Sequence, residues 1–573
     1  MNSILILLLA WIQLASAESE LCPHVILKDG HLKLARNEKV LICGSQESDA
    51  WHEVPLPQAQ YELNTILQNK GFLNARFERA GDRLNVWAGP LKRTEHLIVT
   101  GANGLIQPGK KRKVIGHALD PAKLDEVTAW AELALRRKGY ACPKVETSAQ
   151  VWNATMSAAV EPGQKGVIAA VERTGLEGLN PAAMRRFEAF SAGDAYDVVE
   201  TQITVSRLLS QGLFQSAYFT TRCTDDKVNL HLFTGIGKSR LVRFGLGAST
   251  EEFPFADVWF KNARLDDRAS NFTASIHGSN IRQSFTAGSE LYVVPGSQRS
   301  YLGPRFLLEH RKERAYETNK LEVGADLGRD FDLAKIRLQG RAGPTLNYEK
   351  VLRGAGPPDA KYLSWQGSVA AMSHAYEAFT RDQFEGWTGL FRYKGQRKGI
   401  GSQVNVDRYG LEFKHLWNVG HFSPPLFVFA TRIEAVAVDS KQLTAVDAQH
   451  TLPLDYRVFF GGDENLRGFA RESLNNHGLG YLTALHGGFE VRLIEELPWH
   501  LEPFLLWDYA RLGDRRYTLN KPVYSSSGFG LRWASPFGTL RASAARGRIW
   551  GGDPTTVGYR QEWVYFLSFG QEF

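Results

Sequence analysis

Residues 459–469 read FFGGDENLRGF, a glycine-rich run that ends in an Arg-Gly-aromatic tip. Glycine at positions Gly461, Gly462 and Gly468 allows the chain to enter and leave a sharp turn, because glycine adopts left-handed conformations without steric cost. The fork of donors on Arg467 can then pair with a carboxylate through two parallel hydrogen bonds. The pattern therefore indicates a sharply turning loop with one arginine at its tip, and by itself it is also compatible with a surface arginine in a glycine turn.

The strands around this loop alternate apolar and polar residues with a period of two. In residues 489–493 (FEVRL) the apolar side chains share one face, while Glu490 and Arg492 share the other. Asp508 likewise lies opposite the aromatic residues on either side of it. In a soluble sandwich the apolar face would be the core, whereas in an outer-membrane barrel it would face lipid and the charged face would line the lumen. Alternation alone does not choose between the two.

The end of the chain favours the barrel. One parity is shared by an apolar row that runs to the carboxyl terminus: Trp563, Tyr565, Leu567, Phe569 and Phe573. On a soluble edge strand this row would be an aggregation hazard. At about 20 residues for each strand and its connection, residues 237–573 give about 16 antiparallel strands, within the range of outer-membrane barrels. The sequence therefore predicts an all-β transmembrane barrel over residues 237–573.

A weak internal repeat of roughly 70 residues occupies the chain before the barrel. Each copy has a helical stretch, then a glycine, then two alternating strands around a polar turn. The glycines are Gly71, Gly139 and Gly212, and a glycine in this place suits a helix end that turns left-handed before a strand. Three such glycines, each leading into a hairpin, predict an α+β module that occurs three times.

The N-terminus predicts export. An apolar core over residues 4–14 precedes an A-x-A cleavage site, so residues 1–17 are expected to be a signal peptide. Export makes disulfides possible. Whether any of the four cysteines are bonded is left open by the sequence: Cys22, Cys43, Cys142 and Cys223.

Several classes of function find no support. The net charge of +7 is mild for 573 residues and the basic residues are scattered, so no nucleic-acid partner is expected. No Cys/His spacing suits a metal site. Neither a GxSxG elbow nor an HExxH motif occurs, so we expect no enzyme activity and no cofactor.

The arginine-tipped loop, the three repeats and the aromatic last strand together resemble the BamA/TamA superfamily of outer-membrane assembly factors. In that family the repeats are POTRA domains, β-α-α-β-β units that lie in the periplasm beside the barrel. The resemblance implies a bacterial outer-membrane location and three POTRA-like domains with these boundaries: 18–92, 93–164 and 165–236.

The family also implies a role for the loop, which folds into the lumen so that its arginine packs against acidic residues of the barrel wall. Asp508 matches the family's acidic strand motif, and Glu490 on the preceding strand is a second expected partner of the arginine. The resemblance identifies four residues at the tip of the loop: Leu466, Arg467, Gly468 and Phe469.

The activity implied is non-enzymatic insertion or translocation of client barrels, such as autotransporters, through a lateral seam and by strand addition to the POTRA edges. The expected partners are unfolded outer-membrane clients, the lipid bilayer and a TamB-like protein anchored in the inner membrane. Three repeats resemble the TamA-type members most. A two-partner-secretion exporter of one substrate, a BamA-like general insertase and a structural surface antigen remain alternatives. The expected seam residues are Gly245, Gly247, Gly570 and Phe573.

Overall fold

The computed structural model describes most of the chain, in these ranges: 19–29, 32–45, 54–102, 104–106, 111–378, 384–420, 425–440, 444–494, 497–535, 538–551 and 562–569. The expected signal peptide lies outside the described residues, as do Gly570 and Phe573. The chain divides into two compact units, Met1–Lys165 and Gly166–Phe573. In the ranges given above, no helix is both long and apolar enough to cross a membrane.

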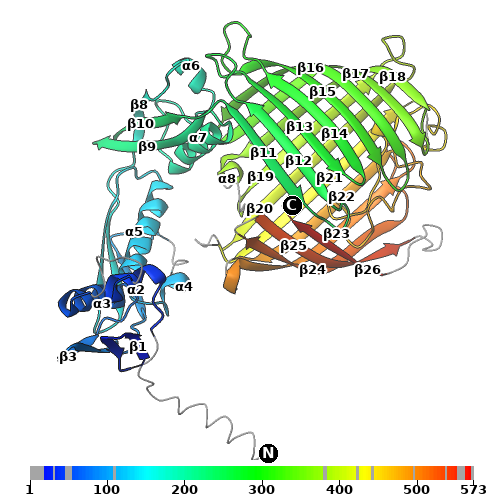
Figure 1. The fold of residues 1–573 in the computed structure, drawn as a ribbon. Helices are drawn as coiled ribbons and strands as arrows, with labels where there is room; N and C mark the ends of the chain where they lie inside the picture. Colours follow the sequence, from blue (N-terminus) through cyan, green and yellow to red (C-terminus); the bar gives the residue numbers. More distant parts are fainter. Residues whose placement is uncertain are drawn as a thin grey trace, which may run out of the picture. The chain divides into compact units, whose positions relative to one another are not determined.

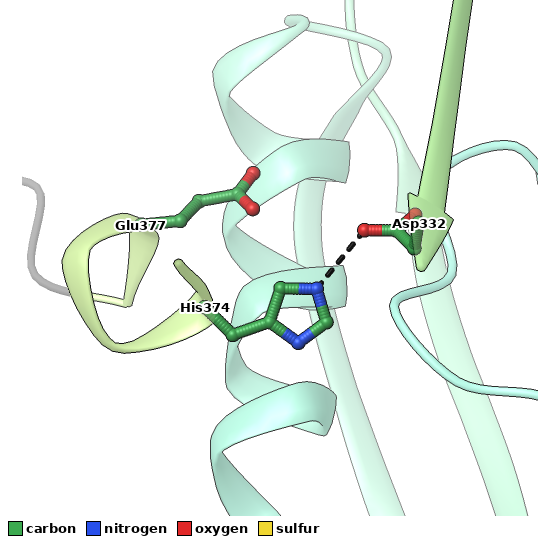
Figure 2. Close-up of side chains that lie close together, drawn as sticks. All are labelled: Asp332, His374 and Glu377. Carbon is green, nitrogen blue, oxygen red and sulfur yellow. Dashed lines mark hydrogen bonds and ion pairs between the residues drawn. The ribbon is translucent and has the colours of Figure 1, made fainter. Parts of the chain in front are cut away.

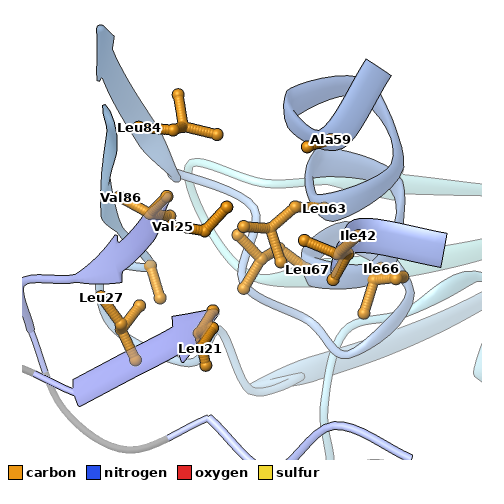
Figure 3. Close-up of a cluster of buried hydrophobic side chains, with 11 residues drawn as sticks. Leu21, Val25, Leu27, Ile42, Ala59, Leu63, Ile66, Leu67, Leu84 and Val86 are labelled. Atoms are coloured by element: carbon orange, nitrogen blue, oxygen red, sulfur yellow. The ribbon is translucent and has the colours of Figure 1, made fainter. Parts of the chain in front are cut away.

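The first unit opens with an α/β module whose strands follow the order β1-β2-β4-β3, with β2 parallel to β4. Leu63 and Leu67 of its second helix are buried in one apolar cluster with Val25 and Leu84 of the sheet (Figure 3). A disulfide joins Cys22 to Cys43 and so ties the first strand to the first helix. The elements are β1 (Ser19–Cys22), β2 (Val25–Leu27), α2 (Arg36–Cys43), α3 (Leu56–Asn69), β3 (Arg76–Ala80) and β4 (Arg83–Trp87).

A second module follows in the same unit, with strand order β5-β7-β6 and β5 parallel to β7. Asp120 begins its long helix by accepting a hydrogen bond from the amide of Lys123 at 2.7 Å. The elements are β5 (His96–Thr100), α4 (Lys111–Val114), α5 (Pro121–Arg136), β6 (Lys144–Gln150) and β7 (Thr155–Glu161).

The second unit begins with a third module of the same topology, in the order β8-β10-β9 with β8 parallel to β10. Its elements are β8 (Val167–Thr174), α6 (Pro181–Met184), α7 (Val198–Ser210), β9 (Phe214–Thr224) and β10 (Lys227–Ile236). The glycine after the last helix of each module has a positive φ, at Gly71 (85°), Gly139 (93°) and Gly212 (72°). The predicted fold class of these modules, POTRA-like α/β domains before the barrel, is confirmed.

Sixteen antiparallel strands then form one sheet that closes almost completely into a barrel (Figure 1). Each strand pairs with its neighbours in the sequence, as in an up-and-down barrel. The strands are β11 (Arg240–Gly247), β12 (Phe255–Asn262), β13 (Asn271–Ser279), β14 (Arg282–Glu290), β15 (Ser300–Lys312), β16 (Glu317–Leu333), β17 (Ile336–Arg353), β18 (Asp359–Ser373), β19 (Gly386–Gln396), β20 (Val406–Val419), β21 (Phe427–Ser440), β22 (Thr483–Leu493), β23 (Leu501–Gly513), β24 (Val523–Ser535), β25 (Gly538–Trp550) and β26 (Trp563–Phe569).

Three short helices lie in the described parts of the connections of the barrel. They are α8 (His374–Glu377) and two 3-10 turns, η2 (Leu454–Tyr456) and η3 (Pro498–His500). The first begins where Ser373 accepts a hydrogen bond from the amide of Tyr376. The helix α8 follows the end of β18 that lies beside the third module (Figure 1).

The two faces of the barrel wall settle the choice that alternation left open. Leu505 and Phe529 point outward and are 51% and 57% exposed, whereas Glu490 and Asp508 point inward and are 1% and 3% exposed. A water-soluble sandwich would show the reverse, with apolar residues inside. The apolar outer face and charged inner face are those of a barrel whose outer wall contacts lipid. The predicted transmembrane barrel of about 16 strands is therefore confirmed.

Candidate functional site

The connection between β21 and β22 folds into the barrel. Its stem is held by paired residues, with Val458 opposite Tyr481 and Phe460 opposite Leu474. At its tip the apolar side chains of Leu466 and Phe469 are buried in one cluster with residues of the barrel wall: Val436, Ala484, Ala510, Leu512 and Tyr524. Burial of this apolar tip holds the whole loop inside the lumen.

Glycines allow this loop to turn tightly against the wall. Gly461, Gly462 and Gly468 have φ angles of 109°, 117° and 96°, in the left-handed region that glycine tolerates. A Cβ atom on Gly468 would lie 2.7 Å from the amide nitrogen of Gly547 and 2.8 Å from Cβ of Ser526. Only a residue without a side chain fits between the arginine tip and strands β24 and β25.

Arg467 lies at the centre of the site. Its Nε and Nη2 donate to the two oxygens of Asp508, at 2.9 and 2.6 Å. Its Nη1 donates to Glu490. The main-chain amide of Arg467 donates to Asp508 as well, at 3.0 Å. Strands β22 and β23 present the two carboxylates to the lumen, so the structure brings together the three residues that the sequence paired.

Further polar groups complete the network around these carboxylates. Arg541 of β25 donates to Glu490 at 2.7 Å, and Arg492 donates to its other oxygen at 2.8 Å. Ser526 of β24 donates to Asp508 at 3.2 Å. The network thus spans four neighbouring strands, and each buried charge has an opposite charge within hydrogen-bond distance. Strand parity alone could have placed Arg541 and Ser526 on the lumenal face.

A second anchor of the loop was not predicted. Asp455, in the part of the loop nearest β21, contacts Lys320 of β16 at 2.6 Å and Lys394 of β19 at 2.8 Å. Glu349 of β17 accepts a hydrogen bond from the amide of Leu454 at 2.9 Å. No motif in the sequence joins these residues, because each lies alone on its strand and only the barrel register brings them together.

The seam is the place where the first and last strands of the barrel meet. Gly245 and Gly247 lie in β11, which pairs with β12 along its whole length. On its other side, the described part of the chain shows pairing with β26 just beyond the end of β11, where Ser249 lies opposite Ser568. The expected seam residues Gly570 and Phe573 fall outside the described residues.

A cluster of charged residues joins the third module to the barrel, and no motif in the sequence predicted it. Arg207 of α7 donates two hydrogen bonds to Asp332 at the end of β16 and two to Glu377 of α8, at 2.6–3.0 Å. His374 donates to Asp332 at 3.0 Å (Figure 2) and lies 3.8 Å from Glu200 of α7. The junction is therefore held by buried ion pairs.

The same cluster has the composition of a metal site. The ligand atoms of Asp332, His374 and Glu377 lie within 4.8 Å of one another (Figure 2). Both carboxylates, however, already bind the guanidinium of Arg207, so a fixed positive charge occupies the place that a cation would take. The arrangement suits a structural junction better than a metal centre.

Protonation of His374 belongs to this junction. Burial by itself lowers the pKa of its imidazole, but the contacts with Asp332 and Glu200 outweigh burial and raise the pKa to about 9. The nearby positive charge of Arg207 opposes this rise. The imidazole is therefore charged at neutral pH and pairs with both carboxylates.

Comparison with known proteins agrees with this architecture. Residues 268–557 match the Omp85 superfamily domain. The structure of BamA from Haemophilus ducreyi lacking POTRA domains 1–3 is similar over 84% of this chain and 99% of that chain, at 14% identity and a TM-score of 0.50. CdiB from Acinetobacter baumannii matches 84% of this chain and 90% of its own, at 14% identity and a TM-score of 0.46. CdiB from Escherichia coli is similar over 89% of this chain and 95% of its own, at 12% identity and a TM-score of 0.46. No curated protein sequence matches the chain.

Proposed function

The chain belongs to the Omp85 superfamily, and we propose that it inserts or translocates client β-barrel proteins, autotransporters among them, at the outer membrane. Members of the superfamily sit in the lipid bilayer and handle substrate proteins. The chain is accordingly an outer-membrane barrel with periplasmic POTRA-like domains. The proposed activity makes and breaks no covalent bond, so it needs neither a catalytic residue nor a cofactor.

The physical problem for a client barrel is its unpaired strand edges. Each unsatisfied backbone group costs several kcal/mol in the hydrocarbon region, so an open sheet does not enter the bilayer unaided. A barrel that exposes a strand edge at its own seam can pair with the client by β-augmentation and satisfy these groups during insertion.

The observation that carries the proposal is the outer edge of β11. Within the described residues, Arg240–Gly247 hydrogen-bond to β12 on one side and to no strand on the other. Phe244 and Leu246 on this strand are 79% and 81% exposed, more than their counterparts on the closed part of the wall. The outer edge of β11 could therefore pair with an incoming strand of a client.

The periplasmic modules support the same reading. The first strand of each hairpin lies at the edge of its sheet: β3, β6 and β9. An extended segment of a client can add to such an edge through main-chain hydrogen bonds. We propose that these edges receive clients and a TamB-like partner, as the number of modules is the one that resembles the TamA-type members.

Depletion of the protein in its host tests the proposal. The assembly of several unrelated outer-membrane barrels is followed by their protease resistance and by their heat-modifiable migration. Loss of assembly across these clients supports an assembly factor. Accumulation of one secreted protein in the periplasm, with normal assembly of barrels, would replace the proposal by a dedicated exporter.

A further inference from the structure

The turn between β11 and β12 carries the described pairing across the seam. The amide of Thr250 donates to the carbonyl of Leu567 at 3.0 Å, and the amide of Phe569 donates to the carbonyl of Ala248 at 3.2 Å. These two bonds flank the opposed pair Ser249 and Ser568. The amide of Leu567 also donates to the hydroxyl of Thr250, at 3.3 Å. Because all of these described contacts across the seam involve residues 248–250, the turn determines whether the two ends of the sheet stay together.

The next residue of this turn reaches the inward loop. Glu251 accepts a hydrogen bond from the amide of Asp463 at 3.1 Å, and its other oxygen lies 3.7 Å from Nη1 of Arg471. The side chain of Glu251 is 12% exposed, so this contact is largely shielded from water. One short segment thus pairs with the last strand through its backbone and with the loop through a side chain.

The loop is shaped for this approach. A Cβ atom on Gly462 would lie 2.6 Å from Oε1 of Glu251, and the φ of Gly462 is +117°. A larger residue at this position would meet the carboxylate, so either the side chain of Glu251 or the loop would have to move and their contact would be lost. The glycine that precedes Asp463 is therefore fitted to Glu251 as well as to the turn of the loop.

The other partner of Arg471 fixes the position of the loop. Its Nη2 contacts Glu313, in the turn between β15 and β16, at 2.9 Å. Arg471 consequently bridges two turns of the barrel, one at the seam and one on the closed wall. A movement of the loop that carries Arg471 inward or outward must therefore change its contact with Glu251.

We propose that Glu251 is a positioning residue that couples the inward loop to the lateral seam. With the loop seated by Arg467, Asp463 and Arg471 hold Glu251, and the turn keeps residues 248–250 paired with β26. When the loop shifts, Glu251 is released and residues 248–250 separate from β26, so that the seam loses its described pairing. The coupling involves contacts within this chain and needs no client. Only its effect on client insertion rests on the proposed function.

The coupling is tested by a cysteine pair at the seam. Ser249→Cys and Ser568→Cys place two thiols at a pair flanked by hydrogen bonds rather than joined by them, where opposed Cα atoms are close enough for a disulfide. The yield of this disulfide under mild oxidation is measured in native membranes without client. Only the heat-modifiable, folded fraction is counted, so misfolding does not enter the result.

The variants differ in how much of the contact they remove. Glu251→Ala loses both contacts with the loop, and Glu251→Gln keeps an oxygen for the amide of Asp463 but loses the ion pair. Gly462→Ala separates the loop from an intact Glu251. We expect the yield to fall more than twofold for Glu251→Ala and Gly462→Ala, and by less for Glu251→Gln.

Glu309→Gln is the matched control. Its carboxylate is 15% exposed, similar to Glu251, but it pairs with Arg282 at 3.2 Å on the barrel wall. The control should leave the yield unchanged. The coupling is overturned if Glu251→Ala cross-links like the parent, or if Glu309→Gln lowers the yield as much.

A client arm separates this inference from the proposed function. Client insertion is measured for the same Glu251 variants without the cysteines. A changed seam with normal client insertion leaves the coupling intact and contradicts the proposed route through the seam. An unchanged seam contradicts the coupling whatever the clients do.

Discussion

Asp508 accepts three hydrogen bonds from Arg467, two from its guanidinium and one from its main-chain amide. The contact therefore fixes the backbone of the loop as well as the side chain. Arginine is suited to this position because its planar fork matches the two oxygens of a carboxylate, whereas lysine offers a single point charge.

Arg467→Ala should release the loop. The substitution leaves Asp508 and Glu490 buried without this partner, and removal of one member of a buried ion pair costs about 3–5 kcal/mol. Arg467→Lys should have a stability to urea and a rate of loop cleavage between those of Arg467→Ala and the parent. The measurements are urea unfolding of the barrel folded in lipid bilayers and protease cleavage within the loop.

Arg516→Ala serves as the control for this prediction. Arg516 pairs with Asp439 at 3.2 Å, and both side chains are well exposed. An exposed pair of this kind contributes about 0–1 kcal/mol. Equal effects of the two alanine variants would show that the buried network does not hold the loop.

Gly468→Ala should have the same result as Arg467→Ala by another route. The added methyl group would meet the backbone of Gly547 and displace the tip, in addition to a left-handed penalty of about 1–2 kcal/mol. Gly478→Ala carries a similar φ penalty, since its φ is +85°, but its Cβ would lie 3.9 Å from the nearest atom. Protease cleavage of the loop should therefore rise for Gly468→Ala and stay at the parental level for Gly478→Ala.

Arg207→Ala should loosen the third module from the barrel. The substitution removes four hydrogen bonds to Asp332 and Glu377, which lie at the end of β16 and in α8. Spin labels on α7 and on the barrel should report a broader distribution of distances. Arg173→Ala breaks a pair with Glu188 inside the module and should leave that distribution narrow. A narrow distribution for Arg207→Ala would place the junction elsewhere.

The junction should also weaken with rising pH. The pKa of His374 in the folded protein is raised to about 9, above its usual value near 6.5. The charged imidazole therefore adds stability that is complete below about pH 6.5 and is lost as the pH rises through about 9. The protection factors of the α7 and α8 amides, which correct for the intrinsic rise of exchange with pH, should therefore decrease over this window.

His374→Gln is the control for the pH dependence. The amide can still donate to Asp332 but does not titrate, so the protection factors of α7 and α8 should no longer change between pH 6.5 and 9. An unchanged pH profile in this variant would show that another group carries the effect.

The sequence indicated the barrel and the tip of its loop because both leave local patterns. Parity of two places Glu490 and Asp508 on the inner face, and the resemblance of the Arg-Gly-aromatic tip to the family's loop points to Arg467 as the residue they bind. Similarly, the glycine after each helix and the hairpin behind it repeat within short windows, so the modules could be recognised without long-range information.

The remaining contacts depend on register and could not be predicted. Asp455 meets Lys320 and Lys394 only because the barrel brings β16 and β19 under the loop. Arg207 finds Asp332 across the junction of two folded parts. Each of these charged residues stands alone in the sequence without a recognisable motif, so a single sequence does not indicate its distant partner.

The most direct test of the proposed function is to lock the seam. In this experiment the oxidised Ser249→Cys/Ser568→Cys variant is compared with a pair in the closed wall, Val323→Cys/Leu346→Cys, whose parent residues lie opposite each other on β16 and β17. The rate of client insertion is measured before and after reduction. We expect the disulfide at the seam to abolish client insertion and its reduction to restore it. The variant with the disulfide in the closed wall should insert clients at the parental rate before and after reduction. Insertion at the parental rate through a locked seam would contradict the account.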